Sequence, residues 1–167
     1  QALGATTRGR FTYIPESKGG GYITGITWGN DLRMMIRNYH LNEAVFIDWT
    51  NKLMEKQEHV HVSSVISMPS NTLFGSVAIG VSQQYLHQLF GHLEHPVVAS
   101  VLAAAADFVL ETGISAQIIN AASEMLGQPV PEAMESHYYR LKCEELLCYT
   151  FALLMQREAV PLSKMHI

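Results

Sequence analysis

The spacing of hydrophobic positions along the chain changes near residue 82. Before that point apolar and polar residues alternate in short runs, and after it apolar residues recur every three or four positions. The first pattern is typical of strands and the second of helices. We therefore predict an α+β fold. A cupin-like antiparallel β-barrel or sandwich is expected over residues 1–82, and a helical part over residues 83–167 is expected to pack on it as one structural unit.

Turn signals bound the expected strands. Gly19-Gly20-Gly21 predicts a turn, and Gly29-Asn30 predicts a tight hairpin between two alternating runs. The expected strands cover residues 10–15, 21–28, 31–39, 44–49, 59–67 and 73–81.

Four helices are expected after the strands. Ser82 and Ser115 are suitable N-caps, because a serine hydroxyl can accept a hydrogen bond from a backbone N–H in the first turn. Glycines follow three of the apolar helical patterns and mark their ends. The expected helices cover residues 83–91, 96–113, 116–127 and 131–158.

The last of these helices carries two apolar strips. It contains no glycine and no proline after Pro131, and it would be roughly 40 Å long. The first strip comprises Tyr138, Leu141, Glu145, Cys148, Ala152 and Met155, and the second comprises Leu146, Tyr149, Leu153 and Leu154. One strip can pack on the rest of the chain, which leaves the other for a partner. We expect a homodimer contact made by Tyr138, Leu141, Glu145, Cys148, Tyr149, Ala152 and Leu153.

Composition narrows the classes of function. The chain has 167 residues, 48% of them hydrophobic, and a formal net charge of -4. Such a mildly acidic chain is not expected to grip nucleic acid by itself, because phosphate binding needs clustered Lys and Arg. We expect Cys143 and Cys148 to be reduced thiols of a cytoplasmic protein. No apolar run is long enough to predict a membrane span. The start QALGATT and the end SKMHI suggest a piece of a longer protein.

Three segments in order carry a resemblance to a known family. They are GYITGITWGNDLRMMIRNYHLN (21–42), VAIGVSQQYLHQLF (77–90) and YYRLKCEELLCYTFALL (138–154). Together they resemble the N-terminal regulatory domain of AraC-type transcription regulators. In the third segment Lys142, Glu145, Leu146 and Leu147 occupy the places of the family's Y-L-x-x-K-x-L-E-L-L run.

The resemblance implies a barrel that senses a small-molecule effector and helices that form a homodimer. It also implies DNA contact through a C-terminal helix-turn-helix module, which we expect to be absent from this chain. One departure is that residues 50–57 lack the further core strand, with a Phe-x-x-x-Gly ending, that the family usually has. We expect either a short, open barrel or a missing segment there.

The sequence contains little evidence for a catalytic site or a metal site. His59 and His61 lie two apart on an expected strand, so both rings point to one face, as in the His-x-His pair of metal cupins. No carboxylate follows them at the distance those sites need, and there is no nucleophile elbow or phosphate loop. We therefore expect no bound metal, no cofactor and no enzyme activity.

A ligand pocket inside the barrel is the better-supported hypothesis, because small barrels enclose ligands with aromatic walls and a few polar anchors. The candidate ligand-binding residues are Trp28, Arg37, Tyr39, Phe46, Trp49, His59 and His61. Each can equally be a core or solvated strand residue. Two alternatives to an effector-sensing domain stay open, namely a metal-dependent cupin dioxygenase or isomerase, and a dimerisation module that senses nothing.

Overall fold

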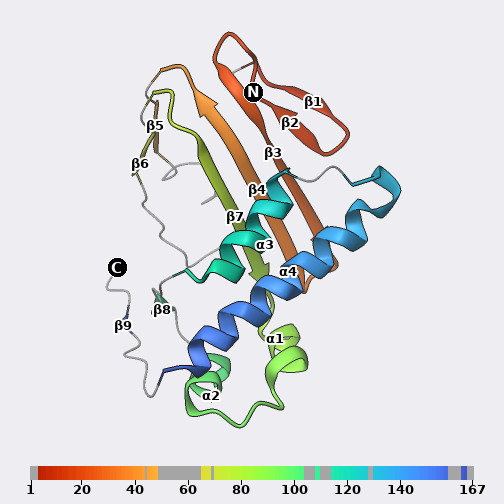
Figure 1. Ribbon diagram of the computed structural model, residues 1–167, viewed down its shortest axis with the longest axis vertical. Helices are drawn as coiled ribbons and strands as arrows, with labels where there is room; N and C mark the ends of the chain where they lie inside the picture. The colour runs from red at the N-terminus through yellow and green to blue at the C-terminus, as the bar shows by residue number, and fades with distance from the viewer. Residues whose placement is uncertain are drawn as a thin grey trace. The chain divides into compact units, whose positions relative to one another are not determined.

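The computed structural model confirms an α+β fold, with a five-stranded antiparallel sheet and four helices (Figure 1). It describes residues 4–43, 45–48, 65–68, 70–103, 108–109, 114–127, 130–157 and 163–164, with side chains described in 4–43, 70–103, 114–127 and 130–157. None of the helices described is both long enough and apolar enough to cross a membrane.

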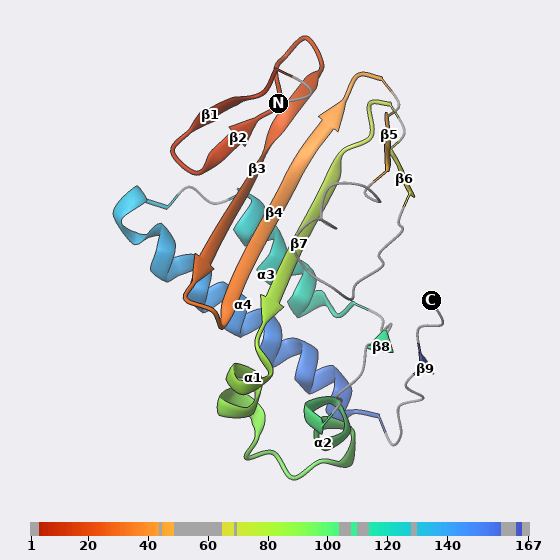
Figure 2. The same cartoon turned by 180° about the vertical axis from the view of Figure 1, so that it is seen from behind.

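The strands within the described residues form three sheets. The main sheet has the order β1-β2-β3-β4-β7, and two short ladders pair β5 with β6 and β8 with β9. The strands are β1 (Thr6–Arg8), β2 (Phe11–Tyr13), β3 (Gly19–Trp28), β4 (Leu32–Leu41), β5 (Val45–Asp48), β6 (Val65–Met68), β7 (Phe74–Val81), β8 (Phe108–Val109) and β9 (Ser163–Lys164). Figure 2 shows β3, β4 and β7 as three long neighbouring strands.

The helices are α1 (Gln83–Phe90), α2 (Pro96–Ala103), α3 (Ala116–Gly127) and α4 (Glu132–Met155). Both serine caps are confirmed. The Ser82 hydroxyl accepts a hydrogen bond from the Tyr85 backbone N–H at 3.1 Å, and the Ser115 hydroxyl accepts one from Ile118 at 3.3 Å. The caps satisfy backbone donors that a helix start otherwise leaves unpaired.

One helix prediction is wrong. The helix expected from residue 96 to Gly113 ends at Ala103, and Phe108–Val109 forms the short strand β8. β8 pairs with Ser163–Lys164, more than 50 residues further along the chain. Phenylalanine and valine favour strands, and pairing with a distant segment decides their conformation.

The short strand β1 was not predicted. It pairs antiparallel with β2, with Arg8 opposite Phe11, through a turn at Gly9-Arg10. The hairpin expected at Gly29-Asn30 is present. Gly29 has φ of 58°, a conformation that a residue with a side chain adopts only at a cost.

By its contacts the chain divides into two compact units. Unit 1 comprises Gln1–Gly25 and Ile36–Ser76, and unit 2 comprises Ile26–Met35 and Val77–His166. The division therefore passes through β3, β4 and β7, not along the boundary at residue 82.

The buried positions of β4 change along its length. Leu32, Met34 and Ile36 are buried, as their alternation predicted. Tyr39 and Leu41 are buried too, although they have the opposite parity. In unit 1 these two residues form a small core with Ile14, next to Ile23 and Phe74, and the rings of Tyr39 and Phe74 lie 5.6 Å apart. The second half of β4 is therefore buried on the face that the first half leaves exposed.

The larger core of unit 2 lies among α1, α2 and α4. Its buried members are Phe90, Val97, Val98, Leu102, Phe151 and Leu154. Phe90 and Phe151 stack with ring centroids 4.0 Å apart and planes 14° apart. The side chains of Gln83 and His87 both contact the backbone oxygen of Leu102, at 2.7 and 3.1 Å, which caps the end of α2. The core thus fixes one end of α4 against two short helices.

Candidate functional site

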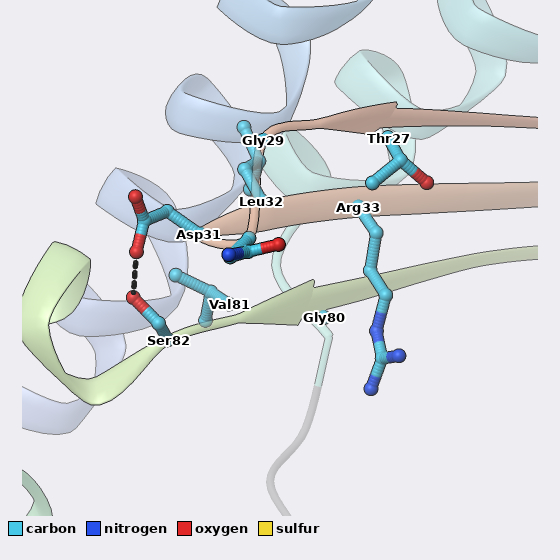
Figure 3. Close-up of a pocket in the computed structure, with 9 residues that line it drawn as sticks. Thr27, Gly29, Asp31, Leu32, Arg33, Gly80, Val81 and Ser82 are labelled. Atoms are coloured by element: carbon cyan, nitrogen blue, oxygen red, sulfur yellow. Dashed lines mark hydrogen bonds between the residues drawn. The ribbon is translucent and has the colours of Figure 1, made fainter.

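A pocket in unit 2 lies where the β3–β4 hairpin meets the end of β7 (Figure 3). Its volume is about 320 Å³. The lining residues are Thr27, Gly29, Asn30, Asp31, Leu32, Arg33, Gly80, Val81 and Ser82. They come from two segments that are far apart in the sequence, so the sheet pairing of β4 with β7 creates the pocket.

Asp31 and Ser82 join the two segments at one end of the pocket. The Ser82 hydroxyl donates to Asp31 Oδ1 at 2.7 Å, and the Ser82 backbone N–H donates to the Asp31 carbonyl at 2.8 Å. Because the same hydroxyl also caps α1, one side chain fixes both the hairpin and the helix start. The Asp31 carboxylate is thereby committed to a structural hydrogen bond.

Arg33 and Gly80 lie at the other end of the pocket. The Arg33 side chain extends from β4 across β7 beside Gly80, whereas Asp31 points toward Ser82 (Figure 3). A Cβ atom on Gly80 would lie only 2.7 Å from Arg33 Cγ and 3.0 Å from Cδ. The absence of a side chain at Gly80 therefore makes room for the aliphatic stem of Arg33.

A strip of mostly exposed residues runs along α4 at heptad spacing, and within it Tyr138 and Glu145 are half-buried. It comprises Met134, Tyr138, Leu141, Glu145, Cys148, Ala152 and Met155, which we call the α4 seam. Met134 is 58% exposed, Leu141 52% and Met155 40%, and Cys148 and Ala152 are also exposed. Alternating steps of four and three residues are the spacing at which two helices pack side by side. The seam is the first of the two strips seen in the sequence, extended by Met134.

The opposite side of α4 packs within unit 2. Its buried residues are Tyr139, Cys143, Leu146, Phe151 and Leu154. Of the second sequence strip, Leu146 and Leu154 are buried, whereas Tyr149 and Leu153 are half-buried beside the seam. The strip built on Leu146 and Leu154 is therefore the one that this chain covers itself.

A charged network lies at the middle of the seam. Lys142 Nζ bonds Glu145 Oε2 at 2.8 Å and also pairs with Glu124 on α3. The hydrogen bonds that Lys142 donates to these two carboxylates raise the pKa of Lys142, so it stays charged. The Tyr149 hydroxyl donates to Glu145 Oε1 at 3.3 Å. The one carboxylate on the seam is thus partly neutralised.

Two further features of α4 have structural roles. The Tyr85 hydroxyl donates to Glu144 Oε1 at 2.6 Å, and Arg140 donates to that hydroxyl at 3.1 Å, which joins α1 to α4. Burial, mainly, raises the pKa of Tyr85. Burial also raises the pKa of the Cys143 thiol to about 12, with a smaller effect of the Glu144 charge. Cys143 is consequently an unreactive core residue.

The sequence-predicted ligand residues are placed as follows. In unit 2, Trp28 Nε1 donates to the Ser136 hydroxyl on α4 at 3.0 Å. In unit 1, Tyr39 belongs to the small core, and Arg37 is half-buried on the same strand. The side chains of Phe46, Trp49, His59 and His61 lie outside the described residues, as does the 50–57 segment. Within the described part of the chain, no cluster of three or more His, Cys, Asp or Glu could hold a metal ion.

Sequence reasoning missed the pocket. None of Asp31, Arg33, Gly80 and Ser82 was a candidate ligand-binding residue. The sequence contains little to indicate that Gly80 lies next to Arg33. A glycine in a strand has many possible roles, and this one follows only from the pairing of β7 with β4. Met134 was also missed, although it continues the heptad spacing by one step.

Comparison of the chain with protein-family models, with characterised proteins and with solved structures gives no significant match.

Proposed function

We propose that this chain is the effector-sensing and dimerisation domain of an AraC-type transcription regulator, and that the α4 seam makes the homodimer contact. The observation that carries the proposal is the seam itself. It is a mainly apolar strip about 30 Å long, with Met134, Leu141 and Met155 exposed, on a helix whose other side is already packed. An exposed apolar strip of this length is typical of an interaction surface.

The seam suits a second copy of the same helix. Its spacing is that of helices that pack knobs into holes, and both partners would contribute the same residues. Its single carboxylate, Glu145, already contacts Lys142 Nζ at 2.8 Å, so association would not bury an isolated charge. Tyr149 and Leu153 border the seam and would contribute to the edge of the contact.

The sensing half of the proposal comes from the strand-rich part of the chain. We propose that its strands belong to a cupin-like barrel that binds the small-molecule effector. Effector binding would favour one arrangement of the dimer and so alter how DNA-binding modules elsewhere in the longer protein are held. With a net charge of -4, the chain alone should not bind DNA.

A fusion assay tests this function. The chain is fused to the DNA-binding domain of a repressor that binds its operator only as a dimer, and repression of a reporter is measured. The wild-type fusion should repress, and Leu141→Glu should abolish repression, because it places a charge on the seam. Ile119→Glu is the matched control, since Ile119 on α3 is 53% exposed, close to the 52% of Leu141, but lies off the seam.

The result that would overturn the proposal is a wild-type fusion that fails to repress although it is expressed and folded. Equal loss of repression by Leu141→Glu and Ile119→Glu would overturn the assignment to the seam. Circular dichroism of both variants separates loss of association from loss of folding.

A further inference from the structure

Arg33 is the only positively charged residue among those that line the pocket of unit 2. It is exposed and, within the described part of the chain, its side chain makes no hydrogen bond or ion pair. Among the residues that line the pocket, the only carboxylate is that of Asp31, and it accepts the Ser82 hydroxyl at 2.7 Å. A guanidinium group at the edge of a pocket with no acidic partner can bind an anion from solution.

The stem of Arg33 lies against the backbone of β7 at Gly80. Gly80 lies directly beneath its Cγ and Cδ atoms, so the stem packs on the backbone of β7. The absence of a side chain at Gly80 permits this rotamer, which holds the guanidinium group beside the pocket. A group that is already positioned loses less conformational entropy on binding.

The rest of the pocket is compatible with an anion. Thr27 and Asn30 are neutral polar residues, and Leu32 and Val81 are apolar. Asp31 is the only acidic residue among those that line the pocket, and its carboxylate accepts the Ser82 hydroxyl at the end away from Arg33 (Figure 3). The positive and negative ends of the pocket are therefore separated.

We infer that this pocket binds a small molecule bearing a carboxylate or a phosphate group, with the anionic oxygens on the Arg33 guanidinium. Both groups present two or more oxygens that match the paired N–H donors of arginine. A volume of about 320 Å³ is at the lower end for ligand pockets, which favours a small metabolite over a dinucleotide or a large cofactor. Thr27 and Asn30 would contact the polar remainder of the ligand.

This inference is independent of the seam on α4. All the lining residues belong to the β3–β4 hairpin, the end of β7 and the start of α1. The site also differs from the barrel pocket expected from the sequence, whose candidate residues include none of the residues that line it. Failure of one proposal leaves the other standing, since their measurements report on different residues.

The test is a titration of the nitrogen-15-labelled protein followed by NMR. Inorganic phosphate and acetate are added in separate series near neutral pH, with ionic strength held constant by sodium chloride. The Arg33 Nε–H signal and the backbone amides of Gly29 and Gly80 are followed. We expect saturable shifts with a dissociation constant on the order of 1 mM for at least one of the two anions, given how few atoms each contains.

Variants separate the shape of arginine from its charge. Arg33→Gln should weaken binding about tenfold or more, and Arg33→Lys should weaken it less, because lysine keeps the charge but loses the paired donors. Gly80→Ala should also weaken binding while leaving the charge in place, since a Cβ there displaces the Arg33 stem. Arg8→Gln is the matched control, because it removes one exposed arginine from β1 and should leave binding unchanged.

The outcome identifies the source of the anion. Shifts with acetate alone assign a carboxylate ligand, shifts with phosphate alone assign a phosphate ligand, and shifts with both assign a site for either oxyanion. Shifts that do not saturate, or that sodium chloride reproduces, overturn the inference. Binding that survives in Arg33→Gln as well as in Arg8→Gln overturns it too.

Discussion

Replacing Leu141 by alanine offers a quantitative test of the α4 seam. Leu141 is 52% exposed in the single chain, so about half of its side chain remains to be buried by a partner. Full burial of a leucine stabilises by about 1.5–3 kcal/mol, and the remaining half corresponds to about 1 kcal/mol. A symmetric dimer contains the residue twice, so Leu141→Ala should cost about 2 kcal/mol of association free energy, or about 30-fold in the dimer dissociation constant.

Sedimentation velocity over a dilution series measures that constant directly. The matched control is Ile119→Ala on α3, which removes a residue of nearly the same exposure, 53%, from a surface off the seam. The control should leave the dissociation constant unchanged within about twofold, as is usual for a surface substitution remote from the interface. At a dilution where all three proteins are monomeric, thermal unfolding of both variants should stay close to that of the wild type, because neither residue is buried in the single chain.

A wild-type chain that stays monomeric at high concentration would show that the α4 seam makes no homodimer contact. Equal effects of the two substitutions would show the same of Leu141. A third outcome is informative in another way. If Leu141→Ala has no effect but a charge at Tyr149 or Leu153 dissociates the dimer, the contact lies on the border of the seam and not at its centre.

The remaining predictions concern the helical core and the two thiols. Phe151→Ala should lower the free energy of unfolding by about 3–5 kcal/mol, because it removes the ring stacked on Phe90. Chemical denaturation measures this free energy, and a loss below about 1 kcal/mol would contradict the packing. At about pH 8, and at a dilution where the chain is monomeric, a thiol-reactive disulfide reagent should label only the exposed Cys148 in the native chain. It should label both cysteines after denaturation, and rapid native labelling of two thiols would contradict the burial of Cys143. Burial raises the pKa of Cys143 from 9.0 to about 12, so its contribution to stability is fully present below pH 9 and is lost as the pH rises toward 12. Cys143→Ala should make that alkaline decline shallower, and an unchanged pH profile would contradict this assignment.

The sequence predicted the local features of the fold well. The hairpin at Gly29 and the caps at Ser82 and Ser115 are encoded by a few adjacent residues, and each is present. Features set by distant pairing were missed. Phe108–Val109 is a strand because Ser163–Lys164 pairs with it, and no pattern around residue 108 contains that information.

Burial of particular faces was harder to predict than the elements themselves. The alternation in β4 predicted that Leu32, Met34 and Ile36 share a face, but not that Tyr39 would be buried on the other one. Likewise, both strips of α4 are apolar in the sequence. Packing of Phe151 and Leu154 against α1 and α2 decides which strip is covered and which remains exposed.

The close contact between Gly80 and Arg33 has a consequence for how this protein can diverge. Any side chain at position 80 would occupy the space that holds the Arg33 stem, so the two positions are constrained as a pair and not singly. In relatives of this chain we expect correlated changes. An arginine at position 33 should accompany glycine at position 80, and a larger residue at position 80 should accompany a shorter one at position 33. Such paired substitutions among related sequences would show that selection has acted on the contact between positions 33 and 80.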